Sequence, residues 1–213
     1  MLPLNFERNR ELKILCLGAH CDDIEIGCGG TLLKIFDEYN VESVKWVVYA
    51  SNEIRKKEAE NCAHHFLEGV DTAIVEINEF RDGFLPFHAV EVKEKFEEIK
   101  STYSPDLIFT HYREDRHQDH RFLSDLTWNT FRNHFILEYE IPKYDGDLGV
   151  PNFYVDLQER YLRKKSEFLL QDFKSQAGKH WFDQETFFAL PRLRGMESAA
   201  RYAEAFYSRK VLF

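Results

Sequence analysis

Short apolar runs alternate with amphipathic stretches along most of the chain. Residues 12–19 form the first apolar run and predict a strand buried in a parallel sheet. Three more runs predict strands, at residues 43–50, 70–77 and 106–110. Between them, apolar residues at helical spacing predict helices, among them one at about 88–103. This repeated β-α-β order favours an α/β fold: a Rossmann-like, doubly wound, mostly parallel sheet with helices on both faces.

The rest of the chain has a weaker pattern. Further strands are predicted at 135–144 and 152–157, followed by helices at 158–173 and 197–209. The turn-rich loop at 145–149 contains two glycines, and we hypothesise that it is a lid over a pocket. A chain of 213 residues is large enough for a sizeable core, so we expect a single domain spanning residues 1–213.

A dense polar cluster follows the first predicted strand. It consists of His20, Cys21, Asp22, Asp23 and Glu25, and three glycines come directly after it. We expect the cluster in a turn beyond the strand, with the next helix beginning near Leu32, because a buried strand does not tolerate it. In open α/β sheets ligands bind at this edge. The glycines do not form a dinucleotide fingerprint, because Leu32 occupies the third glycine position.

A second polar cluster follows the fourth predicted strand and contains Asp115, His117, Asp119 and His120. In the common doubly wound order the first and fourth strands are neighbours, so both clusters face one crevice. Zinc of the catalytic type takes three protein ligands, typically His and carboxylate, and leaves a position for water. The two clusters supply enough ligands for this, with carboxylates to spare for proton transfer. We therefore predict one zinc site.

Simpler interpretations remain open for these residues. Asp22 and Asp23 could cap the following helix, where carboxylates are favourable. His117 and His120 could be surface residues at a helix start. The other polar neighbours are expected to support the site or line its pocket instead of binding the metal: Glu25, His111 and Asp115. The Cys21 thiolate is a possible ligand, although adjacent side chains seldom converge on one metal.

The two clusters also carry a family resemblance. A-H-C-D-D…G-C-G-G-T resembles the A-H-P-D-D…G-x-G-G-T signature of the LmbE/PIG-L-like N-acetylglucosamine deacetylases. D-R-H-Q-D-H resembles the D-x-H-x-D-H motif of the same family. Weaker similarities follow in the expected order, at residues 53–59, 175–176, 194–195 and 202–206. Two departures are Cys21 in place of proline and a short segment, A-S-N-E-I-R, where many relatives have a longer loop.

The resemblance implies a role for each matching residue. Three side chains correspond to zinc ligands: His20, Asp23 and His120. Asp22 corresponds to the general base that acts on water. His117 corresponds to the imidazole that stabilises the oxyanion and assists departure of the amine, and Asp119 to the carboxylate that orients it. Arg55 resembles a substrate-binding arginine at the rim, and its place in the first helical turn after a strand supports this independently.

Composition and net charge exclude some classes of binding partner. The formal net charge of −9 argues against nucleic acid or an anionic membrane as the main partner. No apolar run has transmembrane length, and the N-terminus is charged too early for a signal peptide. The four cysteines form no C-x-x-C pair, and we expect all of them to be reduced thiols. We expect a cytoplasmic protein, and the family resemblance makes a homo-oligomer possible.

The sequence therefore predicts a zinc-dependent hydrolase, with another divalent metal possible as the cofactor. Its expected reaction is removal of the N-acetyl group from an N-acetylated amino sugar or its conjugate, a small-molecule substrate. One alternative is a zinc amidase that acts on a non-sugar amide. Another is a non-catalytic protein that binds a metal or sugar with a decayed site, although Asp22 and His117 are both present.

Overall fold

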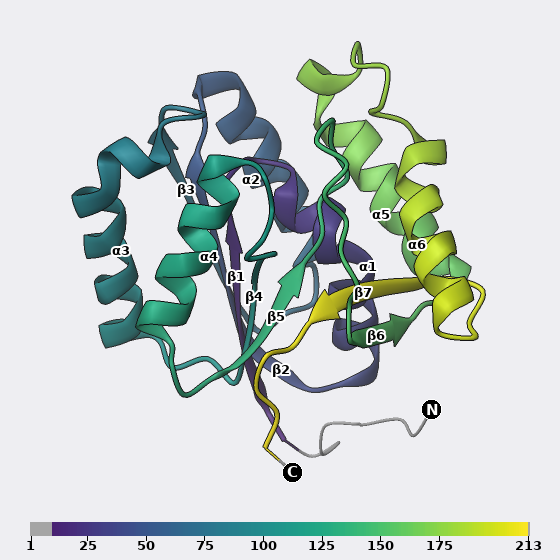
Figure 1. Ribbon diagram of the computed structural model, residues 1–213, viewed down its shortest axis with the longest axis horizontal. Coiled ribbons are helices and arrows are strands. Elements are labelled where there is room, and N and C mark those ends of the chain that lie inside the picture. Colours follow the sequence, from purple (N-terminus) through teal and green to yellow (C-terminus); the bar gives the residue numbers. More distant parts are fainter. Residues whose placement is uncertain (1–9, 213) are drawn as a thin grey trace.

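A seven-stranded sheet lies at the centre of the computed structural model, which describes residues 10–212 (Figure 1). Its strand order is β3-β2-β1-β4-β5-β7-β6. The first five strands in this order run parallel, whereas β7 is antiparallel to both β5 and β6. The strands are β1 (Leu12–Gly18), β2 (Val41–Ala50), β3 (Thr72–Phe80), β4 (Leu107–His111), β5 (Phe135–Tyr139), β6 (Phe153–Asp156) and β7 (Ala203–Tyr207).

Helices cover both faces of this sheet, as the sequence predicts (Figure 1). In β1, Ile14 and Cys16 join the apolar core under α1, α2 and α5, whereas Leu15 and Leu17 join the core under α3 and α4. This alternation explains why the strand is apolar throughout. The helices are α1 (Asp23–Glu38), α2 (Glu53–Phe66), α3 (Ala89–Thr102), α4 (Gln118–Thr130), α5 (Glu159–Asp172) and α6 (Gln184–Glu197), with short 3-10 turns η1 (Leu85–His88) and η2 (Lys174–Gln176). The α/β fold class is confirmed.

The strands β1 and β4 are neighbours, which confirms the topological prediction. Ile14, Leu15 and Cys16 pair in parallel with Leu107–Phe109. The carboxyl ends of both strands therefore open on one edge of the sheet, where the chain changes direction between the halves of the fold. The loops that carry the two polar clusters start at this edge.

The prediction that the first helix begins near Leu32 is wrong, because α1 already begins at Asp23. The glycines lie inside this helix and not in a turn. A Cβ atom on Gly27 would overlap the Tyr139 ring, and one on Gly30 would lie 2.7 Å from Leu157. Glycine has a low helix propensity, so the glycine-rich sequence at 27–30 does not indicate a helix. Close packing against neighbouring elements explains the glycines instead.

This packing predicts that Gly27→Ala destabilises the fold. The added methyl group has to displace a buried tyrosine ring, and overpacking of this kind costs about 1–3 kcal/mol. Urea unfolding monitored by circular dichroism measures the change. Gly178→Ala is the matched control, because a Cβ atom there would have no neighbour within 4 Å and the backbone at Gly178 is not left-handed. Equal midpoints for both variants would contradict the packing account.

The C-terminal prediction is also wrong. The sequence predicts a helix at 197–209, but α6 ends at Glu197 and β7 spans Ala203–Tyr207. Every residue of β7 is buried, so its sequence lacks the alternation of an exposed strand. The strand predicted at 135–144 is shorter than expected, because β5 ends at Tyr139.

Two composition-based expectations concern the surface and the thiols. Within residues 10–212, no helix has the length and apolar content needed to cross a membrane. All four cysteines are buried and free: Cys16, Cys21, Cys28 and Cys62. Residues 1–9, on which the signal-peptide argument rests, lie outside the part of the chain that the structure describes.

Candidate active site

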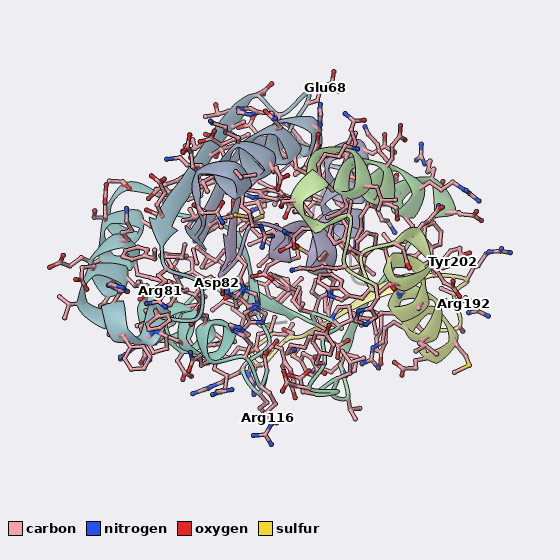
Figure 2. The ribbon with its side chains drawn as sticks, turned by 90° about the horizontal axis from the view of Figure 1, so that it is seen from above. Glu68, Arg81, Asp82, Arg116, Arg192 and Tyr202 are labelled. Atoms are coloured by element: carbon pink, nitrogen blue, oxygen red, sulfur yellow. The ribbon has the colours of Figure 1, made fainter. Side chains whose placement is uncertain are left out.

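The two polar clusters meet at the carboxyl edge of the sheet. Figure 2 looks onto this edge, with Asp82 near the middle of the molecule. The loop after β1 carries His20 and leads into α1, whose N-cap is Asp22. The loop after β4 leads into α4, whose N-cap is His117. Residues nearly a hundred positions apart thereby become neighbours.

Three of the side chains in these clusters form a compact triangle. Nδ1 of His20 lies 3.1 Å from Nε2 of His120 and 3.3 Å from Oδ2 of Asp23, and the third side measures 3.5 Å. Tetrahedral zinc with bonds of about 2.0–2.1 Å separates its ligand atoms by about 3.3–3.4 Å. The three side chains implied as ligands therefore fit a zinc ion, and all are buried or nearly so.

The electrostatics differ between the two imidazoles of the triangle: burial and the neighbouring His111 lower the pKa of His120, whereas His20 is shifted the other way. Although burial opposes it, the neighbouring Asp23, Asp119 and Asp82 raise the pKa of His20 well above its usual value. Burial likewise opposes the pKa shift of Asp23, but the imidazoles of His120, His111 and His20 lower it far below the usual range. The carboxylates around His20 thus favour a positive charge at this point of the site. A divalent cation is stabilised in the same kind of environment.

A further layer of side chains holds His120. Nδ1 of His120 lies 2.9 Å from Oδ2 of Asp115, which also accepts a 2.8 Å hydrogen bond from Lys143. Lys143 donates in turn to Asp147, at 2.7 Å, in the loop proposed as a lid. His111 stacks on His120 with ring centroids 3.9 Å apart. These contacts leave Nε2 of His120 directed at the triangle, as a carboxylate partner does for a metal-binding imidazole.

The side chain of Asp22 does not cap α1, although Asp22 is the N-cap residue of that helix. It makes no capping hydrogen bond, and its Oδ1 instead lies 2.8 Å from the Arg55 guanidinium. Both side chains are largely buried. The simple capping interpretation therefore does not describe Asp22. The pair also brings together the two residues for which the family resemblance implies roles in catalysis, Asp22, and in substrate binding, Arg55.

His117 packs edge-on against His20, with ring centroids 4.8 Å apart. The backbone N–H of Asp119 donates to Nδ1 of His117 at 3.3 Å, so in the neutral ring the proton is on Nε2. The Asp119 carboxylate itself contacts other groups: the backbone N–H groups of Gly83 and Leu85, and Nε2 of His20. Asp119 thus anchors a neighbouring loop as well as His20.

Asp82 is a site residue that the sequence reasoning missed. Its Oδ1 lies 3.1 Å from Nε2 of His20, and this hydrogen bond lowers the pKa of the Asp82 carboxyl group. Its side chain is 70% exposed, so it lies at the mouth of the site. In the sequence, Asp82-Gly83 has only the pattern of a turn. The signal that could have found Asp82 is its position just after β3, at the same edge of the sheet.

The remaining polar neighbours behave as supporting residues. The Cys21 thiol donates to the Ala50 carbonyl, and burial raises its pKa to about 12. A protonated thiol bonded in this way is a poor metal ligand. Glu25 is fully buried, and burial raises the pKa of its carboxyl group well above the usual value.

Comparison with known protein families identifies the family to which this chain belongs. The model of the family described as PIG-L, GlcNAc-PI de-N-acetylase, matches residues 15–131. The match spans more than half of the chain and contains both polar clusters. The chain belongs to the PIG-L family of de-N-acetylases.

Solved structures share the fold across nearly the whole chain. N,N'-diacetylchitobiose deacetylase from Pyrococcus horikoshii is 24% identical with a TM-score of 0.69, and the match covers 92% of this chain and 83% of that one. Teicoplanin deacetylase Orf2, in a zinc-inhibited form, is 14% identical with a TM-score of 0.70, over 92% and 97% of the two chains. GalB, a 4-carboxy-2-hydroxymuconate hydratase from Pseudomonas putida, is 15% identical with a TM-score of 0.70, over 95% and 98%. Because a hydratase shares it, the fold alone does not define the reaction.

Proposed function

We propose that this protein is a zinc-dependent deacetylase that removes the N-acetyl group from an N-acetylated amino sugar or its conjugate. The observation that carries the proposal is the triangle of His20, Asp23 and His120, whose edges of 3.1–3.5 Å suit one tetrahedral cation. Membership of a de-N-acetylase family supports the reaction class. The deacetylases of chitobiose and teicoplanin among the similar structures support an amino sugar as the substrate.

The proposed site residues divide the chemistry between them. A zinc ion held by His20, Asp23 and His120, or another divalent cation there, would supply a Lewis acid. The Asp22 carboxylate takes a proton from the water that attacks the amide carbonyl carbon, and this proton later passes to the amine, whose departure His117 assists. The Nε2–H group of His117 donates to the carbonyl oxygen as negative charge builds up on it. The C–N bond then breaks to give acetate and the free amino sugar.

Two further residues position these groups. Arg55 pairs with Asp22 at 2.8 Å, and this contact between two largely buried side chains fixes the position of that carboxylate. Arg55 is also placed to bind an oxygen of the sugar. His117 is suited to donation from a neutral ring, because burial and the neighbouring His120 and His20 lower its pKa.

Acetate release from a panel of substrates tests the proposed reaction. The zinc-loaded protein is incubated with N-acetylhexosamines, their glycosides and nucleotide conjugates, and simple acetamides. We expect acetate and free amine in equal amounts from one or more of the sugars, and much slower release from the acetamides. Equal rates on simple acetamides would support an amidase instead. Binding of a sugar without turnover, unaffected by Asp22→Asn, would support a non-catalytic protein.

The contact between Asp115 and His120 predicts a change in metal affinity. Asp115→Asn replaces a carboxylate that orients the imidazole by an amide, and loss of such a partner weakens metal binding by about 10–100-fold. Competition with a chromophoric chelator measures the zinc dissociation constant. Asp125→Asn, the same change at an exposed position in α4, the helix that carries His120, is the control. An unchanged zinc affinity in Asp115→Asn would exclude this positioning role.

A further inference from the structure

The segment from Arg81 to Val90 is locked to the candidate active site. Asp82 contacts His20, and the Asp119 carboxylate accepts hydrogen bonds from the backbone N–H groups of Gly83, at 2.8 Å, and Leu85, at 3.2 Å. The Gln118 side chain donates to the Gly83 carbonyl. Leu85 is fully buried. The loop is thus fixed by hydrogen bonds to its backbone and by the buried side chain of Leu85. Its remaining side chains therefore have defined positions.

Two of those side chains are exposed aromatic rings. Phe87 is 75% exposed and Phe84 is 36% exposed, with ring centroids 5.7 Å apart. The Arg81 guanidinium lies 3.7 Å from the centre of the Phe84 ring, which fixes that ring further. Figure 2 shows Arg81 beside Asp82 and farther from the middle of the molecule. Neighbouring exposed aromatic residues on an anchored loop are typical of a binding surface.

The aromatic residues follow closely after Asp82, which lies at the mouth of the site. Asp82 contacts His20 at the mouth of the site, and Phe84 follows two residues later, so their Cα atoms lie no more than about 7 Å apart. That separation is comparable to the width of one sugar ring. An acetyl group is too small to span it, whereas the sugar and the group attached to it are not. The backbone of Phe84 therefore lies about one sugar-ring width from Asp82 at the mouth of the site, and the Phe87 ring lies 5.7 Å from the Phe84 ring.

We propose that Phe84 and Phe87 form an aromatic platform for the substituent that the amino sugar carries, so that the preferred substrate is a conjugate with an aromatic or apolar group and not the free sugar. This inference rests on the proposed deacetylase function and adds its substrate class. A flat ring or apolar chain would pack against Phe87 and against the part of Phe84 that Arg81 does not cover, and would cover apolar area that water now contacts. Phe84 and Phe87 are then specificity-determining residues.

Deacetylation of two glycosides tests the platform. The probes are para-nitrophenyl and methyl N-acetylglucosaminide, which differ only in the substituent. We expect a higher kcat/KM for the aryl glycoside, with the difference mainly in KM. Phe87→Ala should reduce that preference by about threefold to tenfold, since one aromatic contact contributes on this scale. Phe87→Trp should keep or increase it. Met196→Ala, which removes another exposed apolar side chain, on α6, should leave the preference unchanged.

A binding measurement separates this inference from the proposed function. The dissociation constants of both glycosides are measured by calorimetry on the zinc-loaded Asp22→Asn variant, with and without Phe87→Ala. If neither glycoside releases acetate with the native protein, the deacetylase proposal fails for these sugars, and binding alone decides about the platform. Equal affinity for both glycosides, or an equal loss on both in Phe87→Ala, would overturn it. So would an effect of Phe87→Ala that depends on the length of the N-acyl chain and not on the substituent.

Discussion

Replacing Asp22 by Asn is expected to leave zinc bound and to lower turnover by about a hundredfold to ten-thousandfold. The amide cannot take a proton from water, so the step that generates the nucleophile loses its base. The shape of the side chain is kept, and the triangle of His20, Asp23 and His120 does not include Asp22. Steady-state kcat, together with zinc content from inductively coupled plasma mass spectrometry, measures both effects on the same sample.

The control for this variant is Asp71→Asn, the same chemical change at an exposed position away from the site. It should have native turnover and native zinc content. Asp22→Asn with full turnover would show that another group is the base. Asp22→Asn that loses zinc would instead place Asp22 among the ligands. In either case the division of roles between the adjacent Asp22 and Asp23 would be wrong.

His120→Ala is expected to lose metal and activity together. Removing one corner of the triangle leaves two protein ligands for zinc, fewer than the three of catalytic sites. Loss of a mere supporting partner already weakens metal binding by about 10–100-fold, so loss of a ligand should exceed that. Zinc per chain after dialysis against a weak chelator should fall from near one to near zero, and acetate release should fall to background.

His64→Ala is the matched control for the histidine change, because His64 is exposed on α2 and distant in sequence from both clusters. It should retain zinc and activity. Circular dichroism checks that His120→Ala remains folded, since His120 is buried. A folded His120→Ala protein with native zinc content and full activity would refute the ligand assignment.

The topology could be predicted from the sequence because it follows from a general rule. Apolar runs identify β1 and β4, and the doubly wound order makes them neighbours. The start of α1 could not be predicted locally, since Gly27 and Gly30 are unfavourable in a helix and are explained only by the distant Tyr139 and Leu157. The strand β7 could not be predicted for a related reason. It is buried on both faces, so its sequence lacks the alternation of apolar and polar residues that identifies a strand.

The central residues of the site are likewise accessible from the sequence, because the two motifs are local and lie at strand ends. His20, Asp23 and His120 do converge in the structure. Asp82 and Lys143 are not accessible in this way, because each reaches the site from a loop whose conformation no periodic pattern fixes. The Asp119 carboxylate is expected at His117, but it contacts the 83–85 loop and His20. Such contacts depend on tertiary packing and not on spacing.

The most direct test of the account is anomalous diffraction at the zinc absorption edge from crystals of the zinc-loaded protein. We predict one strong peak per chain, at about 2.0–2.2 Å from a ring nitrogen of His20, a carboxylate oxygen of Asp23 and a ring nitrogen of His120. A coordination position should face Asp22 and His117. A peak elsewhere on the chain, or a crystal structure in which His120 lies far from His20 and Asp23, would contradict the hydrolytic mechanism as a whole.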